Sequence, residues 1–358
     1  MCILNTELIE CNRLERPAPQ NQPMISLIIP TYNRAGVLKR ALDSALNIEY
    51  SPADYEIIVV DNGSTDATAA VVKDVQESSP QRRLTYIREE RVGLHNARHA
   101  GVWAAKGDIL IFTDDDATFA PGWLRAYAEA FDAHPEMVAA GGPVRASWEA
   151  PPPKWLVEFI GDAKTFGILS LMEPYDDFCL NSHGEFFGVN MAIRAHVLLE
   201  MGGFNPEAFG DVWLGDGETG LNYKLWNRKM LIGYVPQALV YHHIPPERMT
   251  LQYLRRRMAN QGACDLYSDF HHTLPNTRSM LRRVSGLIWR NYRSWVAAML
   301  VKDRTDVQSL NVQLESARTQ AQLQYMLKVA LNKNFQRFVV KKDWLDDLRP
   351  MEKRSDTP

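Results

Sequence analysis

The chain has 358 residues, of which 46% are hydrophobic and 23% are charged, and its formal net charge is -3. This is ordinary globular composition, suited to one large domain or two modest ones, and without a global positive field we expect no nucleic-acid partner. The four cysteines are scattered and form no CxxC pair. That pattern argues against a zinc ribbon or a disulfide framework and favours a reducing, cytoplasmic setting.

The first 23 residues are predicted to form a loosely attached leader that ends in a proline-rich linker. The apolar stretch of this segment contains acidic residues and lacks a small-residue cleavage site, so a secretory signal is not expected. No apolar run in the chain approaches the roughly 18 residues needed to span a bilayer. We therefore expect a soluble or peripheral protein.

Strands and helices are predicted to alternate in the next hundred residues. Short β-branched or apolar runs predict strands at 25–29, 56–60, 84–90 and 109–112, and helical spacing predicts a helix after each of the first three. This alternation is typical of βαβ units and a mainly parallel sheet. In such sheets ligands bind at the carboxyl ends of the strands.

The later elements are predicted less regularly. We expect a helix at 121–135, one strand at 137–148 and an irregular segment at 149–180. A strand, a turn and a helix are predicted within 186–205, and a further helix at 215–229. One strand with a loop is predicted at 231–246, and helices are predicted from 249 onward. No internal repeat or low-complexity segment is present in the sequence.

Three consecutive aspartates, Asp114 to Asp116, directly follow the apolar strand 109–112. Adjacent carboxylates repel one another, so this loop needs a compensating cation. Carboxylate oxygens suit Mg²⁺ or Mn²⁺, and such an ion also binds a diphosphate. In an extended segment Asp114 and Asp116 point the same way and Asp115 points opposite, so a D-x-D pair can share one site. The alternative is a solvated acidic turn before the helix at 121–135.

Asp61 ends the second predicted strand, beside Asn62 and Gly63. A carboxylate there can accept hydrogen bonds from a base N–H or a ribose hydroxyl, and the alternative is an Asx turn. Because Asp114 lies at another strand end of the same predicted sheet, the pair favours a nucleotide site.

Asp216 and Glu218 lie at the start of the predicted helix 215–229. An acid in this position is often only a favourable charge at the helix N-terminus. The functional interpretation is a general base, which must reach a hydroxyl proton at hydrogen-bond distance. Gly215 and Gly217 would then let backbone and substrate approach closely. The spacing alone favours neither interpretation.

Three further side chains have two open interpretations each. His242 and His243 follow the last predicted strand, where one of the pair can ligate Mn²⁺ or both can be structural. Arg98 can pair with a phosphate or stack on a base, and it can equally pair with Glu89 or Glu90.

Five segments have a characteristic order and spacing within residues 26–226: "SLIIPTYNRAGVLKRALDSAL", "EIIVVDNGSTDAT", "VGLHNARHAGVWAAKGDILIFTDDDATFAPGWL", "GVNMAIRAHVLLEMGGFN" and "GDGETGLNYKLW". Together they resemble a family 2 glycosyltransferase with the GT-A fold. The resemblance implies an α/β fold with a mixed, mainly parallel sheet flanked by helices. It also implies a UDP- or GDP-linked sugar donor, Mn²⁺ or Mg²⁺, inversion at the anomeric carbon, and a carbohydrate or lipid-linked acceptor in cell-surface polysaccharide or glycolipid biosynthesis.

The resemblance also assigns roles to residues of this sequence. It places Pro30, Thr31 and Asp61 in the nucleotide pocket, and Arg98 is an addition to that pocket. We include the neighbours Tyr32 and Asn33 and the middle aspartate, Asp115, among the nucleotide-sugar-binding residues.

Asp114 matches the first acid of the D-x-D motif, which lies near the ribose. Asp116 matches the last acid of that motif, which holds the metal, and His242 falls near the metal or the diphosphate. Glu218 falls on the position of the base. The family has Glu-Asp or Glu-Glu there, so Asp216 stays an alternative base.

On this basis we predict three parts. Residues 1–23 form the leader and linker, and residues 24–246 form the catalytic domain, with a nucleotide-binding half at 24–120 and an acceptor half at 121–246. Residues 247–358 form a helical C-terminal extension. The predicted location is cytoplasmic, with association at the inner face of the plasma membrane left open.

Other functions remain open on the sequence. A sugar nucleotidyltransferase usually has a glycine-rich phosphate loop near its first strand, and "PTYNRAG" lacks those glycines. A phosphohydrolase would carry its paired aspartates after the first strand rather than the fourth. A binding module that keeps the nucleotide site without transfer activity is the non-enzyme alternative.

The C-terminal helices have a basic, aromatic segment. Between Leu281 and Leu310 there are six Lys or Arg and two Asp, and Leu281, Val284, Ile288, Tyr292, Trp295 and Met299 share one helical face. An interfacial helix on anionic lipid has this composition. Packing of that face onto the catalytic domain is the simpler alternative, and it is the one that we favour from the sequence.

Overall fold

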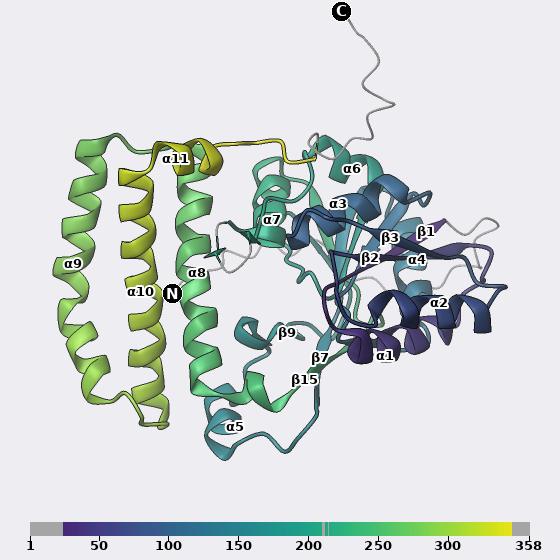
Figure 1. Ribbon diagram of the computed structural model, residues 1–358, viewed down its shortest axis with the longest axis horizontal. Helices are drawn as coiled ribbons and strands as arrows, with labels where there is room; N and C mark the ends of the chain where they lie inside the picture. The colour runs from purple at the N-terminus through teal and green to yellow at the C-terminus, as the bar shows by residue number, and fades with distance from the viewer. Residues whose placement is uncertain (1–23, 210–211, 214, 346–358) are drawn as a thin grey trace, which may run out of the picture.

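The computed structural model describes residues 24–209, 212–213 and 215–345. The predicted leader and linker, residues 1–23, lies outside the described residues. Figure 1 shows an α/β part built around a large sheet, with a group of long helices beside it.

The central sheet has eight strands in the order β10 (Cys179–Asn181), β14 (Leu231–Tyr234), β6 (Met137–Gly141), β11 (Met191–Arg194), β4 (Ile109–Phe112), β1 (Ile25–Thr31), β2 (Tyr55–Asp61) and β3 (Leu84–Arg88). The four strands β4, β1, β2 and β3 pair in parallel. Strand β11 is antiparallel to both β4 and β6. The predicted fold class, a mixed and mainly parallel sheet flanked by helices, is confirmed.

Helices cover both faces of this sheet because successive side chains of a buried strand point to opposite sides. Leu27 and Ile29 of β1 pack on one face, and Ile28 packs on the other. The first face is covered by α1 (Ala35–Leu46), α2 (Thr68–Ser78) and α4 (Trp123–Ala133). The second is covered by α3 (Leu94–Ala104), α6 (Ala195–Glu200) and α7 (Gly217–Asn227).

A second sheet, absent from the sequence-based prediction, has five strands in the order β5 (Ala117–Phe119), β15 (Val240–Ile244), β7 (Val144–Trp148), β9 (Leu171–Met172) and β8 (Thr165–Phe166). The single strand predicted at 137–148 is therefore two strands, β6 and β7, in different sheets. The chain leaves the first sheet at Gly142 and Pro143. Because proline has no backbone N–H, it cannot donate a hydrogen bond to a neighbouring strand, and the strand ends there. The segment 231–246 divides in the same way into β14 and β15.

The segment predicted as irregular, 149–180, contains regular elements. It holds α5 (Lys154–Ile160), the 3₁₀ turn Gly167–Leu169, and the strands β8 and β9, and β10 begins at its end. A further two-stranded hairpin pairs β12 (Ala208–Phe209) with β13 (Val212–Trp213). Strands of two or three residues are too short to give a periodic pattern, so the sequence did not predict them.

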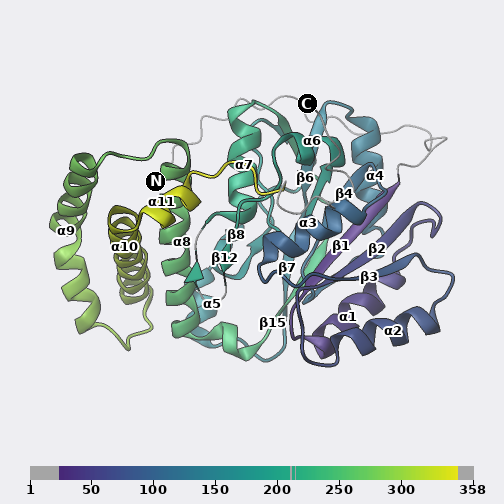
Figure 2. The same ribbon diagram turned by 45° about the horizontal axis from the view of Figure 1, so that its top comes forward.

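The chain ends in the helices α8 (Leu251–His272), α9 (Thr277–Leu300), α10 (Val307–Leu331) and α11 (Lys333–Val339), preceded by a 3₁₀ turn at Pro246–Met249. In Figures 1 and 2, α10 lies between α8 and the outermost helix α9. The helices share a core that includes Tyr267, Leu287 and Val329. The predicted helical extension is confirmed, whereas the domain boundary at residue 246 stays a prediction. None of the helices in the described residues has the length and apolarity to cross a membrane.

Helix α9 differs from its predicted packing. Val284 packs against the core of the C-terminal helices and Trp295 is half-buried, but Leu281, Ile288, Tyr292 and Met299 are exposed. At about 100° per residue, the exposed four lie within about 40° of one another, displaced from the packed side of the helix. The predicted apolar face is therefore divided between the core and the surface.

Candidate active site

A cavity of about 790 Å³ opens at the carboxyl ends of β1, β2 and β4. Strand ends, the start of α3, the start of α7 and the start of α8 all contribute side chains. The lining includes Pro30, Thr31, Tyr32, Arg34, Asn62, Arg98, Asp114, Asp115, Asp116, Glu207, Glu218, His242, Arg248, Tyr253 and Arg257. Most of the predicted site residues therefore lie around one cavity.

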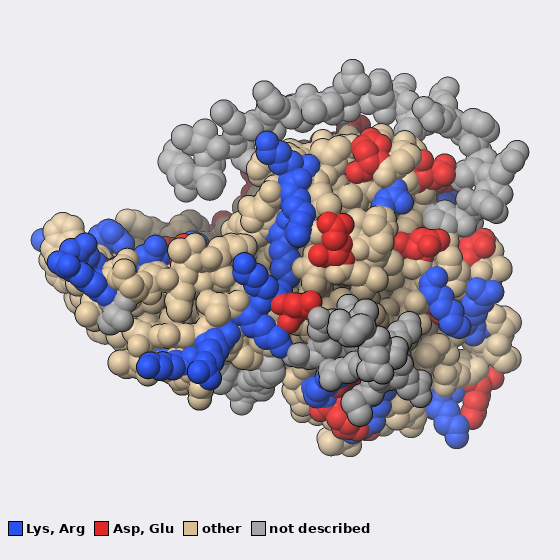
Figure 3. Space-filling model, turned by 90° about the horizontal axis from the view of Figure 1, so that it is seen from above, with Lys and Arg blue, Asp and Glu red and all other residues tan. Residues whose placement is uncertain are grey.

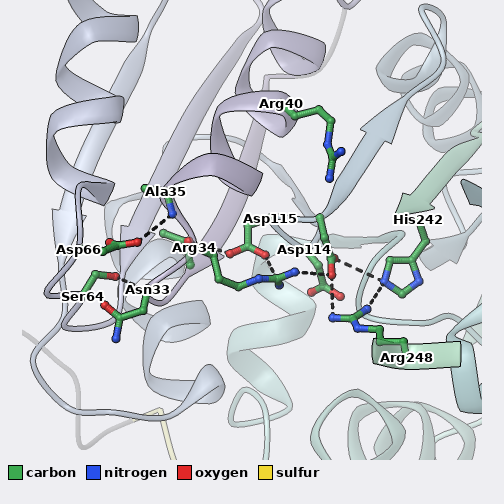
Figure 4. A network of polar contacts seen from close by, with 12 residues as sticks. Asn33, Arg34, Ala35, Arg40, Ser64, Asp66, Asp114, Asp115, His242 and Arg248 are labelled. Carbon is green, nitrogen blue, oxygen red and sulfur yellow. Dashed lines mark hydrogen bonds and ion pairs between the residues drawn. The ribbon is translucent and has the colours of Figure 1, made fainter. Parts of the chain in front are cut away.

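Two arginines of the chain itself compensate the aspartates. Arg34, just after β1, contacts Asp115 at 2.5 Å and Asp116 at 2.8 Å. Arg248 contacts Asp116 at 2.7 Å from the opposite side. Figure 4 shows Arg34 extending toward Asp115, with Arg248 and His242 close together beyond it. The expected compensation of the charges is present, and in this structure it comes from guanidinium groups.

The three carboxylates have different surroundings. Asp115 is buried and accepts a hydrogen bond from the Thr31 hydroxyl at 2.7 Å, and burial raises its pKa to about 7. Burial would likewise raise the pKa of Asp116, but Arg248 and Arg34 hold that pKa below its ordinary value. Asp114 is 34% exposed and lies 4.0 Å from Arg98.

The predicted strand alternation does not continue through the aspartates. Asp115 and Asp116 lie in a turn between β4 and β5, and both contact Arg34. Asp114 is the member of the three that lies near Arg98. Asp115 is therefore tied to the end of β1 by Thr31 and Arg34, rather than turned away by the pleat of an extended strand.

The two adjacent histidines have separate environments. His242 is buried, and its Nδ1 lies 2.9 Å from the Leu169 carbonyl oxygen, so Nδ1–H donates and Nε2 keeps its lone pair. That Nε2 accepts from Arg248 at 2.8 Å and lies 3.5 Å from Asp116 Oδ1. His243 instead contacts the Thr118 hydroxyl. Of the two histidines, only His242 lines the cavity.

The residues present fit a divalent ion that is shared with a substrate. Asp116 Oδ1 is buried without a hydrogen-bond partner, and it faces the His242 nitrogen. Within the described ranges, no group of three or more His, Cys, Asp or Glu is arranged to hold a metal. Mg²⁺-like ions are commonly held by one or two carboxylates, with waters and substrate phosphates completing the shell. Asp116 and His242 match such a partial set.

A second cluster of charges lines the same cavity next to Asp114. Arg98 is buried, and its Nη1 lies 3.0 Å from Glu207 and 3.3 Å from Glu218. Burial raises the pKa of Glu207 well above its ordinary value, and the neighbouring Glu218 charge adds to this. Burial alone would raise the pKa of Glu218. The charge of Arg98 and a hydrogen bond from Glu207 outweigh this effect and lower the pKa to about 2. The two adjacent carboxyls therefore share one proton beside Arg98, and the directions of the two pKa shifts favour Glu218 as the ionised member.

Among the lining residues that were not predicted, three form ion pairs with predicted site residues. Glu207 comes from "GGFNPEAFG", and Arg34 and Arg248 come from "PTYNR" and "IPPERM". Arg34 directly follows a strand end that had been predicted to line the site, and this position was the available signal.

A Cβ at Gly217 would lie 2.4 Å from Glu207 Oε1, and Gly217 has a φ of +47°. Glycine is therefore required where α7 begins against Glu207.

Asp216, the alternative base, is held away from the main cavity. It is buried, and it accepts hydrogen bonds from Asn205 at 2.8 Å and from Ser268 at 2.7 Å. It is absent from the lining of the main cavity, which does include Glu218. The geometry therefore favours Glu218 over Asp216 as the side chain that meets a substrate.

Asp61 and Asn33 are engaged in turns. Asp61 accepts from the Ser64 N–H at 2.7 Å and from the Tyr86 hydroxyl at 2.6 Å, which matches the Asx-turn alternative. Asn33 accepts from the Thr65 N–H at 2.7 Å. Neither lines the cavity, whereas the neighbouring Asn62 does. The nucleotide contacts of Asp61 and Asn33 stay predictions that this geometry does not support.

The chain was compared with known families and proteins. Residues 26–199, just under half of the chain, match the family described as "Glycosyl transferase family 2". Validoxylamine A glucosyltransferase of Streptomyces hygroscopicus subsp. limoneus is 27% identical over 254 residues, covering 63% of this chain and 53% of that protein. A glucosyl-dolichyl phosphate glucuronosyltransferase of Haloferax volcanii is 25% identical over 248 residues, covering 66% of this chain and 75% of that protein.

The chain spans about half the length of the two validoxylamine A glucosyltransferases that it matches. Among solved structures, the mannosyltransferase PcManGT from Pyrobaculum calidifontis, in complex with GDP-Man and Mn²⁺, superposes with a TM-score of 0.53 at 20% identity. The superposition covers 91% of this chain and 87% of that chain. The fold is that of GT-A glycosyltransferases, and the two relatives are named as glycosyltransferases.

Proposed function

We propose that this chain is a family 2 glycosyltransferase that moves a sugar from a nucleotide-diphosphate donor to an acceptor hydroxyl with inversion. One observation carries the proposal: Glu218 and the three aspartates that follow β4 line the same cavity, with Arg98 between Glu218 and Asp114. A single cavity thus offers a proton acceptor and a site for a metal-bound diphosphate. Inversion needs these two on opposite faces of the sugar.

Glu218 is proposed as the general base. Its Oε1 lies 3.4 Å from the Gly188 N–H, and its Oε2 lies 3.3 Å from Arg98, so the carboxylate is held in place by two donors. With a pKa of about 2 it is ionised at physiological pH and can take the proton of an acceptor hydroxyl. The oxygen then forms a bond to the anomeric carbon as the bond to the diphosphate oxygen breaks.

Glu207 and Arg98 are proposed as positioning residues. Arg98 contacts both glutamates from the buried side of the cavity. The protonated Glu207 donates to Glu218 and so keeps the charge on one carboxylate. Without the shared proton, two adjacent carboxylates would repel each other beside one arginine.

The donor side of the cavity is proposed to hold the nucleotide diphosphate. Pro30, Thr31, Tyr32 and Asp114 lie at the strand ends where a nucleotide binds in such sheets. Asp116 and His242 would hold Mn²⁺ or Mg²⁺, which supplies charge stabilisation for the departing diphosphate. Arg34 and Arg248 are cationic groups beside the same position, suited to phosphate oxygens once a donor is bound.

The proposal predicts slow hydrolysis of a nucleotide sugar without any acceptor. We expect release of UDP or GDP from one member of a panel of UDP- and GDP-sugars in the presence of Mn²⁺, since water can replace the acceptor in the open cavity. Addition of EDTA should abolish this release, and Mn²⁺ or Mg²⁺ should restore it. The measurement is a coupled assay for free nucleoside diphosphate.

The same panel distinguishes the alternatives. Binding of a nucleotide sugar in calorimetry, without hydrolysis or transfer to any acceptor, would indicate the binding module. Formation of a sugar nucleotide from a sugar phosphate and a nucleoside triphosphate would indicate a nucleotidyltransferase. Absence of both binding and turnover across the panel would contradict the proposed function.

The assignment of the base to Glu218 predicts a structural role for Asp216. Asp216→Ala leaves the Asn205 amide and the Ser268 hydroxyl without their acceptor, which should cost about 1–3 kcal/mol of unfolding free energy. Urea unfolding measures this loss. In the folded variant, kcat should stay within about tenfold of the unchanged chain, well short of the loss typical of a general base. A kcat loss as large as that of a Glu218 variant would make Asp216 the base.

The acceptor is proposed from the relatives alone. The glucuronosyltransferase of Haloferax volcanii is named for a dolichyl phosphate-linked sugar, and validoxylamine A is named in the other relative. We propose a carbohydrate or lipid-linked hydroxyl as acceptor, in cell-surface polysaccharide or glycolipid biosynthesis. The cytoplasmic location stays a prediction from the cysteine pattern.

A further inference from the structure

Helix α9 exposes a row of large apolar side chains. Trp289 is 77% exposed, Met299 is 73% exposed and Leu281 is 60% exposed. We define the α9 outer face as Leu281, Ile288, Trp289, Tyr292, Val296, Met299 and Leu300, all of which are exposed in the described structure. The helix is the outermost of the C-terminal group in both ribbon views (Figures 1 and 2).

The α9 outer face is separate from the side of the helix that packs. Met280 and Leu287 are buried in the core of the C-terminal helices, with Val284 packed against them. At about 100° per residue, the exposed residues form a stripe about 120° wide whose centre lies on the far side from this core. A surface helix normally places polar side chains there, so a second apolar stripe indicates a second contact.

The charges that border this stripe all have one sign. The helix Thr277–Leu300 contains five arginines and no acidic residue. Arg283 is paired with Asp269 of α8, whereas Arg278, Arg282 and Arg293 lie within or beside the outer face. In Figure 3 the end formed by α9 shows Lys and Arg side chains, whereas basic and acidic side chains are mixed over the α/β part.

We propose that the α9 outer face docks onto an anionic lipid surface. Trp and Tyr have an apolar body and a polar end, which suits the headgroup boundary, and arginines at the edge of the stripe meet lipid phosphates. A second copy of the chain is a poorer occupant, because a symmetric contact would bring the arginines of the two helices together. The inference does not depend on the proposed transfer reaction.

The α9 outer face lies on the same group of helices as part of the cavity lining. Helix α8 contributes Tyr253 and Arg257 to the lining of the cavity, and α10 packs between α8 and α9. The helix that lines the cavity and the helix that carries the α9 outer face therefore belong to one packed group of helices, at its two opposite sides.

Flotation of the full chain with vesicles tests the proposal. The protein should bind vesicles of phosphatidylglycerol and phosphatidylcholine at low salt, bind phosphatidylcholine alone weakly, and dissociate as salt is added. Trp289→Ser with Met299→Ser should lower binding at least about tenfold, because two large apolar contacts are lost. Arg282→Gln with Arg293→Gln should lower binding to the anionic vesicles about fivefold for each arginine removed.

A matched control uses exposed apolar residues elsewhere. Val157 on α5 and Leu199 on α6 are 52% and 41% exposed, and Val157→Ser with Leu199→Ser should leave vesicle binding unchanged. Circular dichroism confirms that each variant is folded. Absence of binding at low salt, or equal binding by the α9 variant and the control, would overturn the proposal. So would a dimer in sedimentation that the α9 variant dissociates, since that would identify a second copy as the occupant.

Discussion

The Glu218→Gln variant is expected to transfer sugar about 10² to 10⁴ times more slowly than the unchanged chain, the loss typical of a missing general base. The amide has the size of the carboxylate but cannot accept the acceptor proton. Donor affinity should change little, because Asp115 and Asp116 are held by Arg34 and Arg248 and have no contact with Glu218 among the described ion pairs. Steady-state kcat and the donor Kd from calorimetry measure the two effects separately.

Two further variants make the test of Glu218 specific. Glu207→Gln keeps an N–H that can donate to Glu218, so its kcat should stay within about tenfold of the unchanged chain, short of the full loss of a general base. Glu207→Leu removes the donor, which raises the pKa of Glu218 and moves the acid limb of the rate to higher pH. Glu158→Gln on the surface of α5 is the inert control. Near-normal transfer by Glu218→Gln would show that the base lies elsewhere.

Asp116→Asn is expected to lower kcat about 10² to 10³ times, the loss typical of a missing electrostatic stabiliser at a leaving group. The variant keeps the shape of the side chain but lacks the charge that faces Arg34, Arg248 and His242. Its donor affinity in Mn²⁺ should fall to the value that the unchanged chain has in EDTA. Calorimetric titration of the donor with and without Mn²⁺ measures this convergence.

The matched control for Asp116 is Asp108→Asn. Asp108 immediately precedes the same strand, β4, and its side chain is exposed at the opposite end from the cavity. It should therefore leave both kcat and donor affinity unchanged. Continued enhancement of donor binding by Mn²⁺ in Asp116→Asn would contradict the assignment of Asp116 to the metal. A thermal melt of each variant separates loss of function from loss of fold.

Local patterns predicted the elements around the site. Strands β1, β2, β3 and β4 and the three helices between them follow from apolar periodicity, which depends only on neighbouring residues. The parallel alternation then places the carboxyl ends of the strands at one edge, so Asp61 and Asp114 were predicted to share one site, and of the two only Asp114 lines the cavity. The very short strands of the second sheet lacked such a pattern, since their pairing is set by distant segments.

The position of the acidic loop and of Glu218 was thus determined by the sequence alone, because strand ends and a helix start are local features. Only the tertiary structure decided which charges meet. Arg34 reaches Asp115 across 81 positions, and Arg98 reaches Glu207 across 109 positions. It also decided that His242 rather than His243 faces the cavity, and that α9 carries apolar side chains outward. Such pairings depend on how whole layers pack, and a one-dimensional pattern contains no distances between layers.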